Sequence, residues 1–554
     1  MFKKHILQTI IVVLLVNVTL KSQTKIVLRD DSIKRGETLN LTKNNEYILE
    51  GFVFVEEDAT LNIEAGTVIK AKQGVAENAS ALVISRGGKI FANGTKEEPI
   101  IFTSELDDTN IYDDLPLYLS GLWGGVIVLG NATINTPGGV EQIEGIPSNE
   151  LRGAYGGNND DDNSGVLRYV SIRHGGTNIG ANNEINGLTL GAVGRGTKVE
   201  FIEIYANSDD GIEFFGGTVN TKNVAIAFCE DDSFDWDEGY RGNNQFWFSI
   251  QSPSTGNNIG ENDGATDPED SKPYAIPYIY NGTFIGSGLQ SNRTESRGFH
   301  IRDNSGGFYK NSIITDLGGA GLEIEDLSDP IAEDSKKRFE SSEIQITNNL
   351  WFNIGDNTYN TVSPDVKGSK PYSQDFVREY LRLNNNVISN PMLAGISRIN
   401  DGGLDPRPNP GIAWELDKAE LPVNNNFFEQ TNYIGAFGDD NWLDGWTFLS
   451  KGGFLGNLKT TSVGELGKQV ENELYLYPNP VIDDLTISYN LINSGELEVE
   501  VYNSFGLLLY KLESNYFNSG IINKTYSLNQ LTPGIYFVKL KTESNETTKK
   551  IIVK

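Results

Sequence analysis

Short apolar segments alternate with turns rich in Gly, Asn and Asp along most of this chain, and the pattern returns about every 22 residues. In two consecutive repeats the matching positions lie 22 residues apart: Ile202 and Val224, Ile204 and Ile226, Asp209 and Asp231, Ile212 and Phe234, and Phe214 and Trp236. The offset is 21 residues between Leu61 and Leu82 and 23 residues between Phe299 and Leu322. One coil of a parallel β-helix has this length, and its coils stack at a strand spacing of about 4.8 Å. The pattern therefore predicts an all-β protein built on a right-handed parallel β-helix.

The predicted β-helix covers residues 25–455. Asn recurs in the turns before apolar strands, where it is suitable because it tolerates left-handed backbone and its amide can bond to the next coil. These turns are Asn348-Asn349, Asn384 to Asn386 and Asn424 to Asn426. Four insertions interrupt the repeat and are expected to form loops on one flank: residues 105–119, 138–164, 253–277 and 329–338. One helix is predicted, from Ser373 as N-cap to Leu383.

The two ends of the chain differ from this repeat. After a linker at residues 456–472, residues 473–554 show strands around Gly and Pro turns, which predicts a small antiparallel β-sandwich. Residues 1–22 combine Lys3 and Lys4 with a short apolar run and are typical of a cleaved signal peptide. That run is too short to span a bilayer comfortably and no later stretch is apolar enough, so no transmembrane span is expected.

Three motifs occur in order in the C-terminal segment: YPNPVIDDLTI from Tyr477, VYNSFG from Val501 and LTPGIYFVKL from Leu531. With these motifs, residues 473–554 closely resemble the type A C-terminal sorting domain of the Bacteroidetes type IX secretion system. The resemblance implies that the type IX machinery carries the chain across the outer membrane. It also implies that the sorting domain is removed and that the protein is attached to lipopolysaccharide on the extracellular face or released.

The body of the chain carries markers of its own. The segments GLWGGVIVLG from Gly121 and YIGAFG from Tyr433, with Gly445-Trp446-Thr447, resemble uncharacterised surface β-helix proteins of the pectin-lyase-like type. That resemblance implies a fold and a location, and it transfers no activity.

Charge narrows the classes of partner. The chain has 45 basic and 75 acidic residues and a formal net charge of −30. Such a surface repels phosphate backbones, so nucleic acid is excluded as a partner, while cations and neutral ligands such as a surface polysaccharide are favoured. Cys229 is the single cysteine, which excludes an intrachain disulfide and a Cys-based zinc site.

Acidic residues crowd two adjacent predicted coils. Strand alternation points Glu213 outward, and Asp235 and Asp237 point outward one coil later. Stacked carboxylates are unfavourable unless a cation, a proton or sugar hydroxyls compensate them, so these residues are predicted to bind a ligand, with calcium as the expected cofactor. Tyr240 and Trp247 are expected to face outward beside them and to offer an aromatic platform for sugar rings.

The same two coils offer a catalytic alternative. Asn207-Ser208-Asp209 one coil before Asp231-Asp232 partly resembles the polygalacturonases, which implies Asp209, Asp231 and Asp232 as the carboxylates of a polysaccharide hydrolase. The chain departs from that family because its Gly-His-Gly would fall near Pro253, where no histidine occurs. A lyase would instead use calcium with Lys222 or Arg241 as the base. Whether the protein is an enzyme stays open.

A second calcium motif lies in an insertion. Asp160, Asp162 and Ser164 place oxygen ligands at alternate positions before a glycine, as the first half of a calcium loop does. Position 171 is Ser, where such a loop would have its bidentate Glu, so a solvated acidic loop is the alternative.

Three functions are compatible with these patterns. The first is a surface protein that binds or processes polysaccharide through the acidic coils. The second is a non-catalytic adhesin or spacer, and the third is an extracellular accessory of a TonB-dependent outer-membrane transporter.

Overall fold

The computed structural model describes residues 24–179, 185–265, 268–291, 293–327, 333–367, 370–456, 474–477, 481, 484–491, 494–503, 507–518, 520–542 and 546–553. The expected signal peptide at residues 1–22 and nearly all of the linker at residues 456–472 lie outside the described residues.

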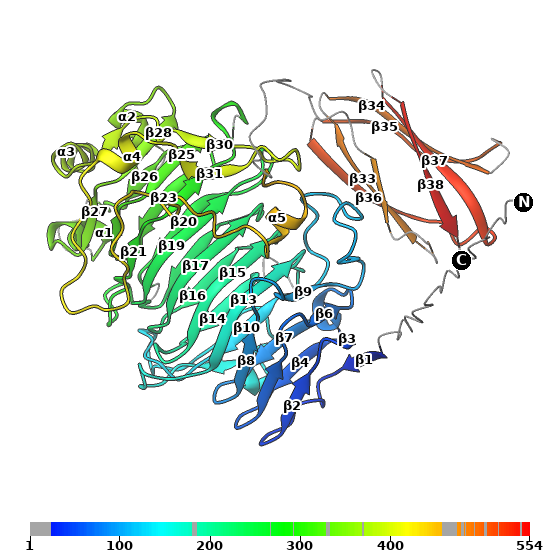
Figure 1. Cartoon of the computed structure of the whole chain (residues 1–554), viewed down its shortest axis with the longest axis horizontal. Helices are drawn as coiled ribbons and strands as arrows, with labels where there is room; N and C mark the ends of the chain where they lie inside the picture. The colour runs from blue at the N-terminus through cyan, green and yellow to red at the C-terminus, as the bar shows by residue number, and fades with distance from the viewer. Residues whose placement is uncertain are drawn as a thin grey trace, which may run out of the picture.

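Stacked coils form the body of the molecule (Figure 1). Each full coil adds one strand to a nine-stranded parallel sheet, here called sheet B: β4 (Phe52–Val55), β7 (Ala81–Ile84), β10 (Val126–Leu129), β14 (Leu188–Gly191), β16 (Ile212–Phe215), β18 (Phe234–Asp237), β20 (Asn258–Asp263), β23 (Arg297–Arg302) and β26 (Leu322–Ile324). The remaining coil strands form an 18-stranded parallel sheet, sheet A: β1 (Thr24–Leu28), β2 (Thr38–Leu41), β3 (Asn45–Leu49), β5 (Thr60–Ile63), β6 (Val68–Ala71), β8 (Lys89–Asn93), β9 (Ile100–Ser104), β13 (Gly165–Arg173), β15 (Lys198–Tyr205), β17 (Asn220–Ala227), β19 (Asn243–Ile250), β21 (Tyr278–Tyr280), β22 (Thr283–Ile285), β24 (Gly307–Lys310), β25 (Ile313–Leu317), β27 (Ile344–Thr347), β28 (Leu350–Ile354) and β29 (Val387–Ile388).

Sheet A supplies two sides of each coil. The long strand β13 pairs with β8 through residues 165–168 and with β9 through residues 170–172. Tyr169, between these two stretches, adopts a left-handed conformation with φ of 49° and turns the strand from one side to the next. Three strand stretches per coil, all paired in parallel, confirm the predicted parallel β-helix.

The core is a set of columns that run through the coils. Inward positions of sheet B stack in register and are almost fully buried, for example Leu188, Ile212 and Phe234. Aromatic rings extend these columns between the sheets, since Phe234 lies parallel to Trp247 with ring centroids 4.1 Å apart. Such stacking of large side chains buries apolar area that stabilises the coils.

The two Asn turns within the coils behave as predicted, whereas Asn424 to Asn426 lie after the last coil and no strand follows them in residues 427–456. Asn348 and Asn385 have left-handed backbone, with φ of 59° and 54°. The amide of Asn349 donates to Asn386 Oδ1 on the next coil at 3.1 Å. Neighbouring turns are therefore joined by side-chain hydrogen bonds in addition to the strand ladders.

The coils end at Ile388, so residues 390–456 do not continue the β-helix predicted for residues 25–455. We call them the return segment: β30 (Leu393–Gly395), β31 (Asp405–Pro408), α4 (Ile412–Glu415) and α5 (Phe448–Lys451). Prolines at 391, 406, 408, 410 and 422 remove backbone donors that a ladder needs. The segment runs back along sheet A, where the buried Glu203 carboxylate accepts from the backbone nitrogens of Phe448 and Leu449 at 2.7 and 3.1 Å.

Insertions and helices complete the body. The helices on the last coils are α1 (Ser335–Glu340), α2 (Tyr359–Val362) and α3 (Asp375–Leu383). α3 ends at the predicted residue and its N-cap is Gln374, one residue after the predicted Ser373. Insertion 138–164 carries the short hairpin β11 (Glu141–Gln142) and β12 (Ala154–Tyr155). The prediction of a loop over residues 253–277 is wrong at β20, which is a full strand of sheet B.

The C-terminal region is a separate antiparallel structure, as predicted. β32 (Leu474–Tyr477), β33 (Asp484–Leu491) and β36 (Gly520–Ser527) form one sheet. β34 (Gly495–Asn503), β35 (Leu508–Phe517), β37 (Gly534–Thr542) and β38 (Glu546–Val553) form the other. Leu485, Val499 and Val538 lie in its own apolar core, distinct from the core of the coils.

Candidate functional site

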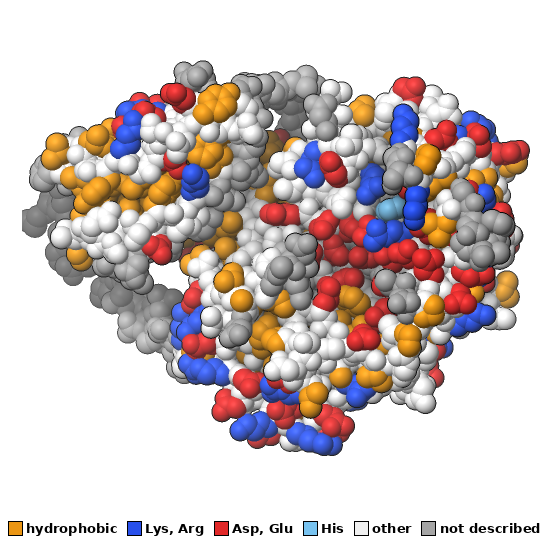
Figure 2. Space-filling model, turned by 180° about the vertical axis from the view of Figure 1, so that it is seen from behind, with side chains coloured by type: hydrophobic (Ala, Val, Ile, Leu, Met, Phe, Trp, Pro, Cys, Tyr) orange, Lys and Arg blue, Asp and Glu red, His pale blue; other side chains and the backbone are white. Residues whose placement is uncertain are grey.

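One outward-facing column of sheet B changes character along the stack of coils. Its members are paired in register in the order Phe54, Val83, Ile127, Thr189, Glu213, Asp235, Glu261, His300 and Glu323. The first three side chains are apolar and are covered by insertion 138–164, whose Ile146 and Tyr155 pack on them. The column becomes polar at Thr189, and Thr189 and Glu213 are still buried, with Glu144 of the insertion close to Glu213. Figure 2 shows a band of Asp and Glu side chains on one face, with Arg, Lys and His side chains near one end.

Three overlapping groups of carboxylates lie along this face, and we call them together the acidic groove. In each group one oxygen per residue lies within 4.8 Å of the others: Asp209, Asp210 and Asp231; Asp210, Glu213 and Asp235; and Asp232, Asp235 and Glu261. They come from β16, β18 and β20 and from the turns that precede β16 and β18. The predicted stacking of Glu213 on Asp235 is confirmed by the register of β16 and β18.

The groove is electrostatically unfavourable for ionised carboxylates. Burial, and then the neighbouring acidic side chains, raise the pKa of Asp210, Glu213, Asp232 and Asp235 well above its ordinary value. Burial also raises the pKa of Asp231. Protons or a bound cation would relieve this crowding.

Two of these carboxylates also organise the turns. Asp210 Oδ1 accepts from the backbone nitrogen of Asp232 at 2.9 Å, and Asp232 accepts in the same way from the backbone nitrogen of Asn258. Asn258 donates its amide to Asp232 at 3.2 Å and to Glu261 at 3.3 Å. Part of the acidic column is therefore structural, because each carboxylate caps the turn of the next coil.

Among the residues that the structure describes, basic side chains reach the groove at one end. His300 lies between Glu261 and Glu323, at 3.7 and 3.4 Å, and Arg302 binds Glu261 and Asp263 at 3.0 and 2.7 Å. Although burial opposes it, bonding to the two glutamates raises the pKa of His300 to about 9. These cations also lower the pKa of Glu261, in contrast to its acidic neighbours.

Buried oxygens in the groove lack hydrogen-bond partners within the described residues. Within the part of the chain that the structure describes, Asp235 Oδ1 is buried and makes no hydrogen bond. The buried amide oxygen of Asn258 is in the same position. Unpaired buried oxygens are costly, and oxygen-only surroundings are the ones that hard divalent cations prefer.

Two known families match this chain. The pectate-lyase-like β-helix domain matches residues 32–380, more than half of the chain. The chain belongs to this family. The secretion-system C-terminal sorting domain matches residues 475–554, so this β-helix protein is secreted by the type IX system and attached to the cell surface. No match to a curated protein was found. Among the described residues, no helix is long and apolar enough to cross a membrane.

The predicted aromatic platform of the β-helix protein is wrong, because Tyr240 and Trp247 are fully buried in the core. For Trp247 the cause is a change in coil length. Phe215 pairs with Asp237 at an offset of 22 residues, whereas Val224 pairs with Trp247 at an offset of 23. The one-residue difference turns Trp247 inward, as a register shift does in any strand.

The catalytic candidates are only partly brought together. Asp209 and Asp231 lie in the same cluster of neighbouring carboxylates, whereas Asp232 lies in another cluster and accepts a hydrogen bond from the amide of Asn258. The two candidate lyase bases lie elsewhere: Lys222 is on sheet A and donates to Phe427 O at 2.8 Å, and Arg241 pairs with Asp160 at 3.3 Å.

The predicted calcium loop is held by protein groups. Asp160 accepts from Thr133 N at 3.0 Å and pairs with Arg195 and Arg241 at 3.5 and 3.3 Å. Asp162 accepts from the backbone nitrogen of Asn131 at 3.3 Å and from Ser164 Oγ at 3.4 Å. Calcium binding by Asp160, Asp162 and Ser164 stays a prediction, and the bonds present explain the acidic side chains as anchors of this loop.

Sequence reasoning missed the far side of the groove. Glu261 and Asp263 lie on β20, inside a segment expected to be a loop, and His300 was not among the candidate residues. The available signal was Ile259, the single large apolar residue of β20, which is fully buried.

Proposed function

We propose that this secreted surface protein binds a divalent cation, calcium in the first place, in the acidic groove and uses it to hold an extracellular polysaccharide. The observation that carries the proposal is the set of three overlapping carboxylate groups on β16, β18 and β20. Seven carboxylates crowd in the acidic groove. Among the described residues, the ion pairs of His300 and Arg302 reach the β20 side of the groove, at Glu261 and Asp263.

The chemistry of the groups favours a hard cation. Calcium takes six to eight oxygen ligands from carboxylates, amide carbonyls and water. The groups contain only Asp and Glu, and the unpaired oxygens of Asp235 and Asn258 lie beside them. Soft ions that require thiolate or imidazole ligands are disfavoured.

A cation in this position would also link the protein to a glycan. Ligands from the sheet occupy one side of the ion, which leaves its outer positions for water, sugar hydroxyls or a sugar carboxylate. Because Tyr240 and Trp247 are in the core, stacking on those rings cannot contribute. Recognition would therefore rest on the ion and on polar side chains of the groove.

Thermal unfolding tests the cation. An ion that binds only the folded state raises the melting temperature by mass action. We expect calcium to raise the melting temperature of the wild type relative to a chelator, and the double variant Asp231→Asn with Asp235→Asn to lose this shift. The matched control is Asp439→Asn with Asp440→Asn, which removes the same charge from exposed positions of the return segment.

The polysaccharide is tested separately on a carbohydrate array with and without calcium. Calcium-dependent retention that the groove variant loses would support the proposal. A wild-type melt that calcium leaves unchanged, together with an array without signal, would leave the acidic residues as turn formers and make the spacer or adhesin function the better one.

A hydrolase is the second candidate, and one observation favours it. Asp209 and Asp231 bring carboxylate oxygens within 4.8 Å, and burial raises the pKa of Asp231. Retaining glycosidases use carboxyl groups about 5 Å apart, one of them protonated. New reducing ends released from an acidic polysaccharide by the wild type but not by Asp231→Asn would establish it.

A further inference from the structure

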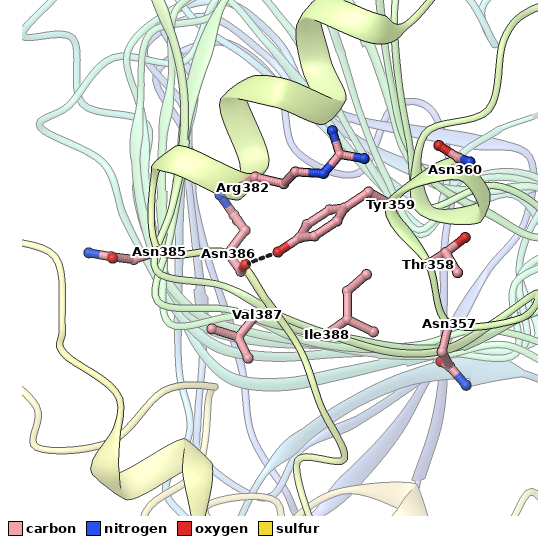
Figure 3. A pocket seen from close by; sticks show the side chains of 9 residues that line it. All are labelled: Asn357, Thr358, Tyr359, Asn360, Arg382, Asn385, Asn386, Val387 and Ile388. Atoms are coloured by element: carbon pink, nitrogen blue, oxygen red, sulfur yellow. Dashed lines mark hydrogen bonds between the residues drawn. The ribbon is translucent and has the colours of Figure 1, made fainter.

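A second polar cavity lies on the last coil of the β-helix (Figure 3). Its walls are the turn into α2, the C-terminal end of α3 and the short strand β29. Its volume is about 680 Å³, which is within the range that ligand sites occupy. It shares no residue with the acidic groove.

Tyr359 is fixed at the centre of this cavity. Its hydroxyl donates to Asn386 O at 2.7 Å. Asn386 is itself held, because its Oδ1 accepts from the amide of Asn349 and from the indole of Trp351. The tyrosine ring therefore presents a rigid apolar face.

Arg382 is the one charged residue in the cavity lining. Its guanidinium carbon lies 5.1 Å from the centroid of the Tyr359 ring. Among the described residues Arg382 has no hydrogen bond or ion pair, although Glu379 lies one turn earlier on α3. Arg378 on the same helix differs, since it pairs with Asp365 and Asp375 at 2.8 and 2.6 Å. The donors of Arg382 are thus available to a ligand.

The rest of the lining is amide and aliphatic. Within the described residues the side chains of Asn360 and Asn385 make no hydrogen bond, and both are exposed. Val387 and Ile388 add an apolar surface on β29. A stacked cation, free amides and a small apolar surface together complement a sugar ring that carries an acidic group.

We propose that this cavity binds an anionic sugar unit, either a uronate or a sulfated sugar, of an extracellular polysaccharide. Arg382 would bind the acidic group through two parallel N–H bonds, the geometry that its planar fork favours. Tyr359 would contact the ring of the sugar, and Asn360 and Asn385 would bind its hydroxyls. The remainder of the surface has a net negative charge, so a lining without carboxylates is required for such a ligand.

Isothermal titration of the full chain in the presence of a chelator tests binding to this cavity while no calcium is available to the acidic groove. The probes are a glucuronate-containing disaccharide, a sulfated disaccharide and a neutral disaccharide of the same size. We expect at least one acidic probe to bind and the neutral probe to bind at least about tenfold more weakly. Arg382→Gln should lower affinity for the acidic probe at least about tenfold, and Arg382→Lys should restore only part of it.

Arg35→Gln is the matched control, since it removes an exposed arginine at the other end of the coils and should leave binding unchanged. The groove variant Asp231→Asn with Asp235→Asn should also bind normally, which separates this proposal from the calcium proposal. Equal binding of acidic and neutral probes, unchanged affinity in a folded Arg382→Gln protein, or no binding of either acidic probe by the wild type would overturn it.

Discussion

The two halves of the outward face of sheet B are built on the same kind of parallel strands, and they differ in what covers those strands. On β4, β7 and β10 the column consists of Phe54, Val83 and Ile127 beneath the insertion at residues 138–164. On β16, β18 and β20 the same column consists of Glu213, Asp235 and Glu261. In both halves the strands pair in parallel and the members of the column lie in register. The backbone of the coils therefore allows either outcome, and the outward residue of each strand decides whether that part of the sheet is covered or is a charged surface.

The largest effect is expected in the covered half. Ile127→Glu would place an unpaired carboxylate beneath the insertion, where Ile127 is fully buried. We expect a loss of about 3–5 kcal/mol in the unfolding free energy of the β-helix, measured by denaturant titration. Ile127→Val is the control and should cost about 1 kcal/mol. Equal stability of the two variants would show that the insertion does not seal this half.

A smaller effect, dependent on pH, is expected where the halves meet. Glu238 accepts from Tyr155 Oη at 2.8 Å, and burial raises its pKa to about 8. Between an unfolded-state pKa of about 4.5 and the folded value, unfolding releases a proton, so stability falls as pH rises through this window and is level above it. The Glu238→Gln variant has no carboxyl group to titrate at this position, so it lacks this contribution to the pH dependence of stability.

The measurement compares melting temperatures of wild type and Glu238→Gln from pH 5 to pH 8. The variant should gain on the wild type as pH rises, by about 2 kcal/mol after discounting for partial solvent screening. A difference that stays constant with pH would contradict the raised pKa.

The smallest changes in unfolding free energy are expected on the neighbouring strands β18 and β20, and they should have opposite signs. Asp235 is surrounded by acidic side chains, so Asp235→Asn should stabilise the protein in chelator by about 1 kcal/mol. Glu261 is one rung further and pairs with His300 and Arg302, so Glu261→Gln should destabilise it by a similar amount. Chemical denaturation of both variants checks this, and shifts of equal sign would remove the distinction between the two rungs.

The coil repeat was predictable from sequence because inward residues recur at a nearly constant interval. The direction of each side chain was less predictable, because one extra residue in a coil reverses that direction, as at Trp247. The stacking of Glu213 on Asp235 lay within a regular pair of coils and was correctly predicted. The contribution of Glu261 was not, because β20 is mostly polar and is a strand only through its pairing with β18 and β23.

The end of the coils was also not predictable from the repeat. The return segment contains short apolar stretches and Asn turns like those of the coils, for example Asn424, which also has left-handed backbone. Its side chains pack against the outside of sheet A, as Phe437 and Phe454 do in a cluster with Phe248 and Phe228. Local pattern does not distinguish an apolar residue that faces the interior from one that covers an outer face.

The return segment has a mechanical consequence. Phe454 packs against Tyr205 and Phe228, on β15 and next to β17, so the described part of the body ends beside the middle of the stack. Tension applied at residue 456 would first meet the hydrogen bonds that Gly453 and Phe454 accept from Gly402 and Leu404, and then the bonds of α5 to Glu203. It would not peel the terminal coil away rung by rung, which is the easier way to unravel a solenoid.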